Sequence, residues 1–156
     1  MNKAFQRSGS KSNAHIGRDF ELHALNYFKS QGIALIKNFK ISLGIEEQKK
    51  LHAFDLGCKQ AKIIVECKSH KWTTGGNVPS AKLTVWNEAM LYFIASPDEY
   101  RKVMFVLKDY CSKRKETLAE HYIRTYFHLI PTNVEFWEYD TETSEAKQII
   151  IDYATN

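Results

Sequence analysis

The chain has few of the residues that crosslink or interrupt a fold, and it has no long apolar run. Its three cysteines, Cys58, Cys67 and Cys111, are odd in number and lack the paired spacing of a disulfide framework or a zinc site. We therefore expect a reducing, cytoplasmic compartment. No apolar run approaches the roughly 20 residues that span a bilayer, so no membrane partner is expected. The first residues also lack the apolar segment of a secretory signal.

Phosphate-binding loops are missing too. The sequence has neither a Walker A pattern nor a glycine-rich dinucleotide loop after a strand, so ATP-driven and redox chemistry are not indicated. What is present is a chain of 156 residues with 44% apolar and 13% aromatic residues, enough for one domain with a sizeable core. Its net charge is +4, and the basic surplus comes from the first third. This balance permits a polyanionic partner without establishing one.

The organisation along the chain predicts a short arm followed by one domain. Residues 1–15 are polar, basic and rich in Ser, which indicates a flexible N-terminal arm, and residues 16–156 form the domain. Hydrophobic periodicity and breakers predict helices over 16–30, 80–96 and 117–129. They predict strands over 33–43, 51–58, 61–68, 102–108, 134–139 and 148–153.

This order predicts a mixed α/β fold. The three early strands are connected too tightly for crossovers and should be antiparallel, whereas later strands reached through helices can pair in parallel. We place the core at about 16–108 and a C-terminal addition of a helix and strands at 116–153.

Chemistry is concentrated at the end of one apolar strand, which reads Ile-Ile-Val-Glu-Cys-Lys. Alternate strand residues share a face, so Glu66 and Lys68 point the same way and Cys67 points to the other. Asp55 on the preceding strand can reach the same place across a hairpin. Two converging carboxylates suit a hard cation such as Mg²⁺, and a neighbouring lysine can assist a water. An ordinary cross-strand ion pair is the alternative.

The wider pattern resembles the PD-(D/E)XK nuclease superfamily, which has the restriction-endonuclease-like fold. The pattern consists of an acid-bearing helix, GRDFELHALNYF, then Phe54-Asp55, then an apolar strand that ends in Glu-x-Lys. The resemblance covers residues 16–108 and implies an αβββαβ core whose mixed central sheet is flanked by helices. One position departs from the motif, since Phe54 stands where the named proline would be.

The resemblance also implies a role for each matching residue. Asp55 and Glu66 would be metal ligands and catalytic residues, and Cys67 would offer the metal its backbone carbonyl. Lys68 would be the catalytic lysine. Glu21, on the first helix, would support the metal through water.

A second set of candidates flanks this centre. Glu88 and Tyr92 lie four apart on one helix face and resemble the Gln-x-x-x-Tyr motif of related nucleases, with Glu in place of Gln. The loop after Lys68 combines charge, hydrogen-bonding groups, a stacking surface and the flexible pair Gly75–Gly76. The residues expected to bind nucleic acid are His70, Lys71 and Trp72 in this loop and Lys113 and Arg114 further along.

The function expected from these residues is a divalent-metal-dependent endonuclease that hydrolyses DNA phosphodiester bonds, of restriction or repair type. Its cofactor would be Mg²⁺, with Mn²⁺ as a substitute, and its partner DNA. A homodimer is expected because two sites can serve two strands. The alternatives are a catalytically inactive nucleic-acid-binding domain of the same fold, a junction-resolvase-like nuclease, and an interaction domain in which the Glu66–Lys68 pair is structural.

Overall fold

The computed structural model describes residues 12–152. Most of the predicted arm therefore lies outside the described residues, and Ser12 already caps a helix that begins earlier than expected. The helices are α1 (Asn13–Ser30), α2 (Ser80–Ala95), α3 (Leu118–Tyr126) and a 3-10 turn, η1 (Phe127–Leu129). The strands are β1 (Ile36–Leu43), β2 (Lys50–Cys58), β3 (Ile63–Lys68), β4 (Arg101–Leu107), β5 (Tyr110–Cys111), β6 (Glu116–Thr117), β7 (Val134–Asp140) and β8 (Glu145–Ile149).

A six-stranded mixed sheet forms the centre of the molecule, in the order β1-β2-β3-β4-β7-β8. The early pairs β1–β2 and β2–β3 are antiparallel, and β3–β4 and β4–β7 are parallel. The predicted mixed α/β class and the antiparallel early strands are therefore confirmed. The first six elements follow one another as α, β, β, β, α, β.

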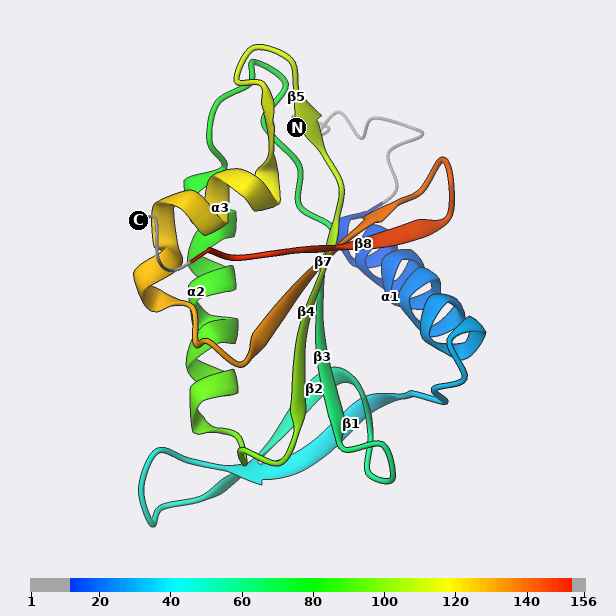
Figure 1. Cartoon of the computed structure of the whole chain (residues 1–156), viewed down its shortest axis with the longest axis vertical. Coiled ribbons are helices and arrows are strands. Elements are labelled where there is room, and N and C mark those ends of the chain that lie inside the picture. Colours follow the sequence, from blue (N-terminus) through cyan, green and yellow to red (C-terminus); the bar gives the residue numbers. More distant parts are fainter. Residues whose placement is uncertain (1–11, 153–156) are drawn as a thin grey trace, which may run out of the picture.

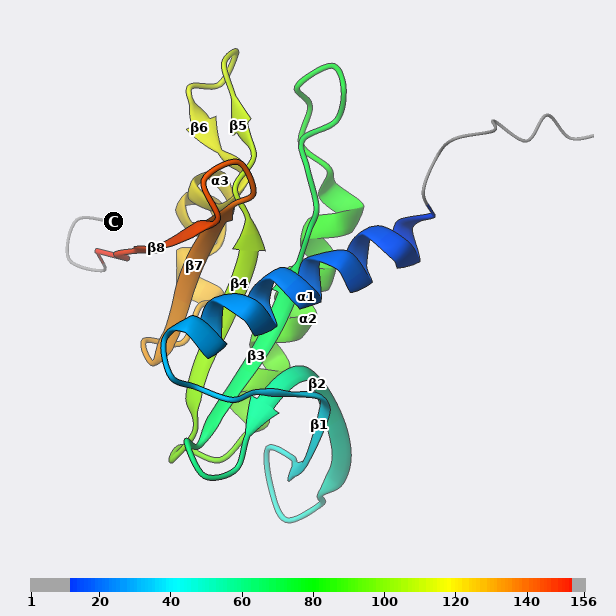
Figure 2. The same cartoon turned by 90° about the vertical axis from the view of Figure 1, so that its right-hand side faces the viewer.

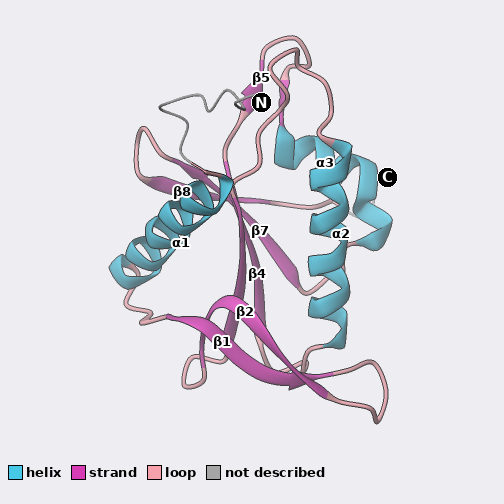
Figure 3. Cartoon of the chain, turned by 180° about the vertical axis from the view of Figure 1, so that it is seen from behind, coloured by secondary structure: helices cyan, strands magenta, loops and turns pink. Residues whose placement is uncertain are grey.

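Helices cover both faces of the sheet. Figure 1 shows α1 on one side and α2 with α3 on the other, and Figure 3 shows the same arrangement from behind. Each face has its own core, because alternate strand residues point in opposite directions. Ile63 and Val65 of β3 pack with α1, whereas Ile64 packs with α2 and α3.

The β1–β2 hairpin curves across one end of the sheet and reaches α2 (Figure 3). At its tip the N–H of Gly44 donates to the carbonyl of Ala95 at the end of α2, over 3.1 Å. Further along β2, Gly57 has no room for a side chain, because a Cβ there would lie 2.3 Å from the ring of Phe39. The absence of a side chain at Gly57 thus lets the ring of Phe39 on β1 pack directly against the backbone of β2.

Several predicted boundaries need correction near the C-terminus. The third helix ends at Tyr126 and tightens into η1, and Thr117 is its N-cap rather than its first residue. The last strand ends at Ile149, before the predicted limit at residue 153, which lies outside the described residues. Between the strand predicted to end at residue 108 and the helix predicted to begin at residue 117, no strand was predicted. The structure has the two-stranded β5–β6 hairpin there.

Candidate active site

The candidate site lies where β2 separates from β3. The two strands pair from Cys58 to Leu56, and the pairing stops before Asp55. The carboxylate of Asp55 then accepts the backbone N–H of Cys67 over 2.8 Å. The side chain thus takes the place of a main-chain acceptor, because a part-buried N–H needs a partner where the ladder ends.

Glu66 and Lys68 share one face of β3, as the strand period predicts. The ammonium of Lys68 lies 2.8 Å from Oε2 of Glu66 and 3.9 Å from Oδ2 of Asp55. Both side chains are largely withdrawn from water, with 9% of Glu66 and 13% of Lys68 exposed. The structure therefore brings Asp55, Glu66 and Lys68 to one point.

The electrostatics of this group follow from burial. Burial raises the pKa of Glu66 to about 7, although the Lys68 ammonium favours the charged carboxylate. For Lys68, burial opposes the charged form, but Glu66 and Asp55 outweigh it and raise the pKa of the amine. Lys68 is thus an ammonium at neutral pH, suited to donating hydrogen bonds and stabilising negative charge rather than accepting a proton.

The candidates Glu88 and Tyr92 on α2 face the same group. The hydroxyl of Tyr92 donates to Oε1 of Glu88 over 2.9 Å. Both line a cavity of about 170 Å³ whose other walls include Asp55, Glu66 and Lys68. The helical spacing predicted that both residues share one face of α2, and in the structure that face lies beside the carboxylates.

His52 is a site residue that the sequence reasoning missed. Its ring stacks on Tyr92 with centroids 3.8 Å apart, and its Nε2 lies 3.9 Å from Oε1 of Glu66. Within residues 12–152 this buried Nε2 has no hydrogen-bond partner. Burial lowers the pKa of His52, so the ring is a neutral polar group against Glu66. No local pattern marks it, because the sequence does not show that α2 packs over β2.

Asp55 and Lys68 also line a larger cavity of about 770 Å³. Glu21 on α1 forms part of its wall and is held by an ion pair with Lys37 at 3.4 Å. The loop after Lys68 and the start of α2 supply further parts of the wall. Asp55 and Lys68 thus lie at the junction of two cavities.

His70 lines the larger cavity in a fixed protonation state. The indole N–H of Trp86 donates to Nδ1 of His70 over 2.8 Å. Burial lowers the pKa of His70 to about 4, and Lys68 and Lys82 add to this effect. Because Nδ1 of the neutral ring accepts this hydrogen bond, the ring's own proton is on Nε2. The side chain can therefore donate one hydrogen bond to an anion.

This geometry gives a titration that NMR can follow. The His70 imidazole is expected to stay neutral from pH 8 down to about 5, with its proton on Nε2. Trp86→Phe removes the donor to Nδ1 and raises the pKa of His70, because that hydrogen bond exists only with the neutral ring. The check is the ¹⁵N shift of both His70 ring nitrogens against pH, in the unaltered chain and in the variant. A His70 titration near 6.5 in the unaltered chain contradicts the prediction.

Trp72 does not offer the free stacking surface that was expected. Its backbone N–H donates to the Asp109 carboxylate over 2.7 Å, and its indole N–H donates to the Asp109 carbonyl over 3.0 Å. The guanidinium of Arg114 lies over the ring, 5.1 Å from its centroid. Trp72 is therefore held against the β5–β6 hairpin by Asp109, which precedes β5, and by Arg114 in the hairpin turn.

The group fits a hard cation through carboxylate oxygens. Among residues 12–152, no three His, Cys, Asp or Glu side chains come together as a metal-binding set. Asp55 and Glu66 are nevertheless both within reach of one positive charge, the Lys68 ammonium. Mg²⁺ is commonly bound through one or two carboxylates and keeps several waters, so two carboxylates are a sufficient donor set.

Comparison with protein-family models, with curated proteins and with solved structures finds no match for this chain. Over residues 12–152, no helix is both long and apolar enough to cross a membrane.

Proposed function

We propose that the chain is a divalent-metal-dependent endonuclease that hydrolyses phosphodiester bonds in DNA. The observation that carries this proposal is the convergence of Asp55, Glu66 and Lys68 at the junction of two cavities. The element order α, β, β, β, α, β supports the resemblance to PD-(D/E)XK nucleases. A structural ion pair would not need to lie on a cavity wall.

Asp55, Glu66 and the backbone carbonyl of Cys67 would hold the cation. Bound Mg²⁺, or Mn²⁺ in its place, supplies a Lewis acid that activates water and neutralises charge at the phosphate. The ammonium of Lys68 orients the attacking water and stabilises the negative charge that develops on the phosphate oxygens. Glu21 supports the site from α1 through water.

The surroundings of the larger cavity suit a DNA strand. His70 offers a neutral N–H, and the cations Lys71 and Lys82 line the same cavity. Phosphate contacts of this kind position a nucleic acid without reading its sequence. A homodimer would place two such sites on the two strands of a duplex.

Incubation with supercoiled plasmid tests the proposal. In Mg²⁺ the chain is expected to convert the plasmid into nicked, linear or fragmented DNA, and with EDTA the plasmid stays supercoiled. Discrete fragments indicate a sequence-specific enzyme, and nicks indicate a single-strand cutter. An intact plasmid in both Mg²⁺ and Mn²⁺ overturns the enzymatic proposal, and retained DNA binding then favours the inactive binding domain.

A further inference from the structure

Two segments that lie far apart in the sequence project together beyond the sheet. They are the loop of residues 71–78 and the β5–β6 hairpin of residues 109–117, which we call the hairpin lobe. Figure 2 shows both beyond the carboxyl ends of β3 and β4. Lys68 is the last residue of β3 and lies at this same end of the strand, so the lobe lies beside the candidate active site.

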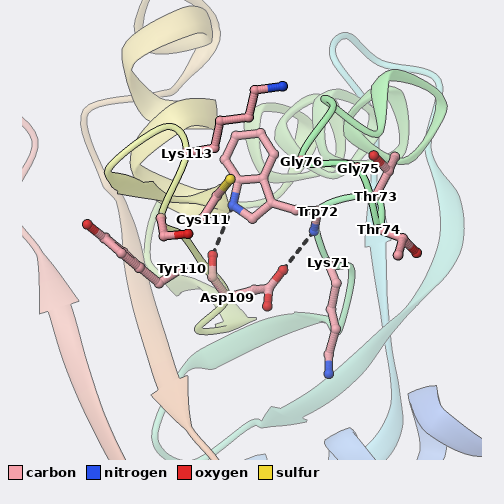
Figure 4. A pocket seen from close by; sticks show the side chains of 11 residues that line it. Lys71, Trp72, Thr73, Thr74, Gly75, Gly76, Asp109, Tyr110, Cys111 and Lys113 are labelled. Carbon is pink, nitrogen blue, oxygen red and sulfur yellow. Dashed lines mark hydrogen bonds between the residues drawn. The ribbon is translucent and has the colours of Figure 1, made fainter.

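The lobe is a single unit held by specific contacts. Asp109 binds both N–H groups of Trp72, as Figure 4 shows. Arg114 donates to the carbonyl of Gly76 over 2.8 Å while covering the Trp72 ring. Gly76 has φ +73°, and a Cβ there would lie 3.3 Å from the sulfur of Cys111, so glycine permits both the turn and the close approach.

These contacts limit what Arg114 and the backbone of the loop can offer to a phosphate. Arg114 holds the lobe together through its Nε–H, which fixes the position of its guanidinium over Trp72. The N–H of Gly76 donates to the carbonyl of Thr73 over 2.8 Å, so it is not free for a phosphate either. The groups left for binding are three exposed lysines, Lys71, Lys113 and Lys115. Among the described residues, none of the three pairs with a carboxylate.

The lobe is continuous with the site. A cavity of about 420 Å³ within the lobe is lined by Lys71, Thr73 and Lys113. Lys71 and Thr73 also line the larger cavity beside Lys68. The carboxylate of Asp109, the acidic residue of the lobe cavity, accepts the backbone N–H of Trp72. A chain of negative groups leaving the site over Lys71 would next meet Lys113.

We propose that the hairpin lobe is a second contact surface for the substrate, binding the DNA backbone away from the scissile phosphate through Lys113 and Lys115. This inference rests on the proposed nuclease function for the identity of the ligand. Three unpaired cations on a rigid support complement a phosphate chain, and rigidity limits the entropy lost on binding. The lobe thereby extends the length of DNA that the enzyme holds.

The salt dependence of DNA binding tests this surface. The wild type, Lys113→Ala/Lys115→Ala and the control Lys59→Ala are compared by fluorescence anisotropy on a 30-base-pair duplex in EDTA. Lys59 is exposed in the turn between β2 and β3, away from the lobe. The double variant is expected to make the negative slope of log K against log salt shallower by about 2, because each phosphate contact contributes about 1. The control leaves the slope unchanged.

Duplex length separates the lobe from the site. On a duplex too short to extend beyond the larger cavity, the wild type and the double variant are expected to bind equally. Thermal unfolding checks that both variants fold, and Lys113→Glu/Lys115→Glu is expected to weaken binding further.

The outcomes distinguish this inference from the nuclease proposal. Equal slopes for the double variant and the wild type overturn the inference even if plasmid is cleaved, and so does an absence of DNA binding at low salt. If the slope depends on Lys113 and Lys115 but the chain never cleaves DNA, the lobe is supported as a DNA-binding surface. Only the proposed enzymatic function is then overturned.

Discussion

Lys68→Met is expected to lower plasmid cleavage in Mg²⁺ on the order of 10³-fold. Methionine keeps most of the length and apolar character of the lysine side chain but removes the ammonium that lies 2.8 Å from Glu66. The variant loses the group that would stabilise charge on the phosphate, and it leaves Glu66 buried without its partner. The loss should therefore appear in kcat, measured by initial rates over a range of DNA concentrations.

The neighbouring strand provides a matched control for this substitution. Lys102 on β4 is 1% exposed, and its ammonium lies 3.8 Å from Asp98 and 3.4 Å from the carbonyl of Ser96. It lines neither cavity of the site, so Lys102→Met removes a buried charge without touching the proposed chemistry. Cleavage by Lys68→Met at the wild-type rate would show that the Asp55–Glu66–Lys68 group is structural.

Asp55→Asn extends the same test to the metal. Asparagine preserves the acceptor for the Cys67 N–H, which the carboxylate now binds over 2.8 Å, but removes one negative charge from the proposed donor set. Cleavage is expected to fall as steeply as in Lys68→Met, while duplex binding in EDTA persists. Loss of folding along with activity would instead assign Asp55 to the β2–β3 junction alone.

Phe54→Ala is expected to destabilise the protein by about 3–5 kcal/mol, the cost of deleting a buried aromatic side chain. Phe54 is 0% exposed. Its ring stacks on Phe93 of α2 at 5.7 Å and meets the edge of His52 at 4.9 Å. The substitution leaves a cavity where β2 packs against α2, so the strand that carries Asp55 should become less rigid.

Urea unfolding measures this effect, with Leu51→Ala as the control. Leu51 lies on the same strand but is 66% exposed, so its truncation should change the free energy of unfolding by less than about 0.5 kcal/mol. A change below 1 kcal/mol for Phe54→Ala would contradict the prediction. The packing also explains why an aromatic residue stands directly before Asp55: position 54 belongs to the core.

The sequence predicted the features that depend on local periodicity. The period of two in β3 placed Glu66 and Lys68 on one face, and the helical period placed Glu88 beside Tyr92. Asp55 was also placed correctly, because a short turn between β2 and β3 limits where the two strands can meet. Each of these inferences needs only the geometry of one element or one hairpin.

The features that sequence reasoning missed depend on packing between distant segments. The β5–β6 hairpin has two residues in each strand, too few for an alternating pattern, and its turn uses Lys115 at φ +58° rather than a glycine. It is held by contacts of Asp109 and Arg114 with a loop more than thirty residues earlier. His52 was missed for the same reason, because its place beside Glu66 depends on α2.

The position of Asp55 and Lys68 between two cavities bears on inhibition. A DNA strand of the kind proposed would lie in the larger cavity, whereas the smaller one, beside Tyr92, is bounded by His52 and Glu88. A small molecule seated in the smaller cavity would lie against Glu66 and also against Asp55 and Lys68, which line both cavities. It would lower the maximal rate by blocking the catalytic group while leaving the wall of His70, Lys71 and Lys82 open to DNA, so noncompetitive inhibition is open to this site.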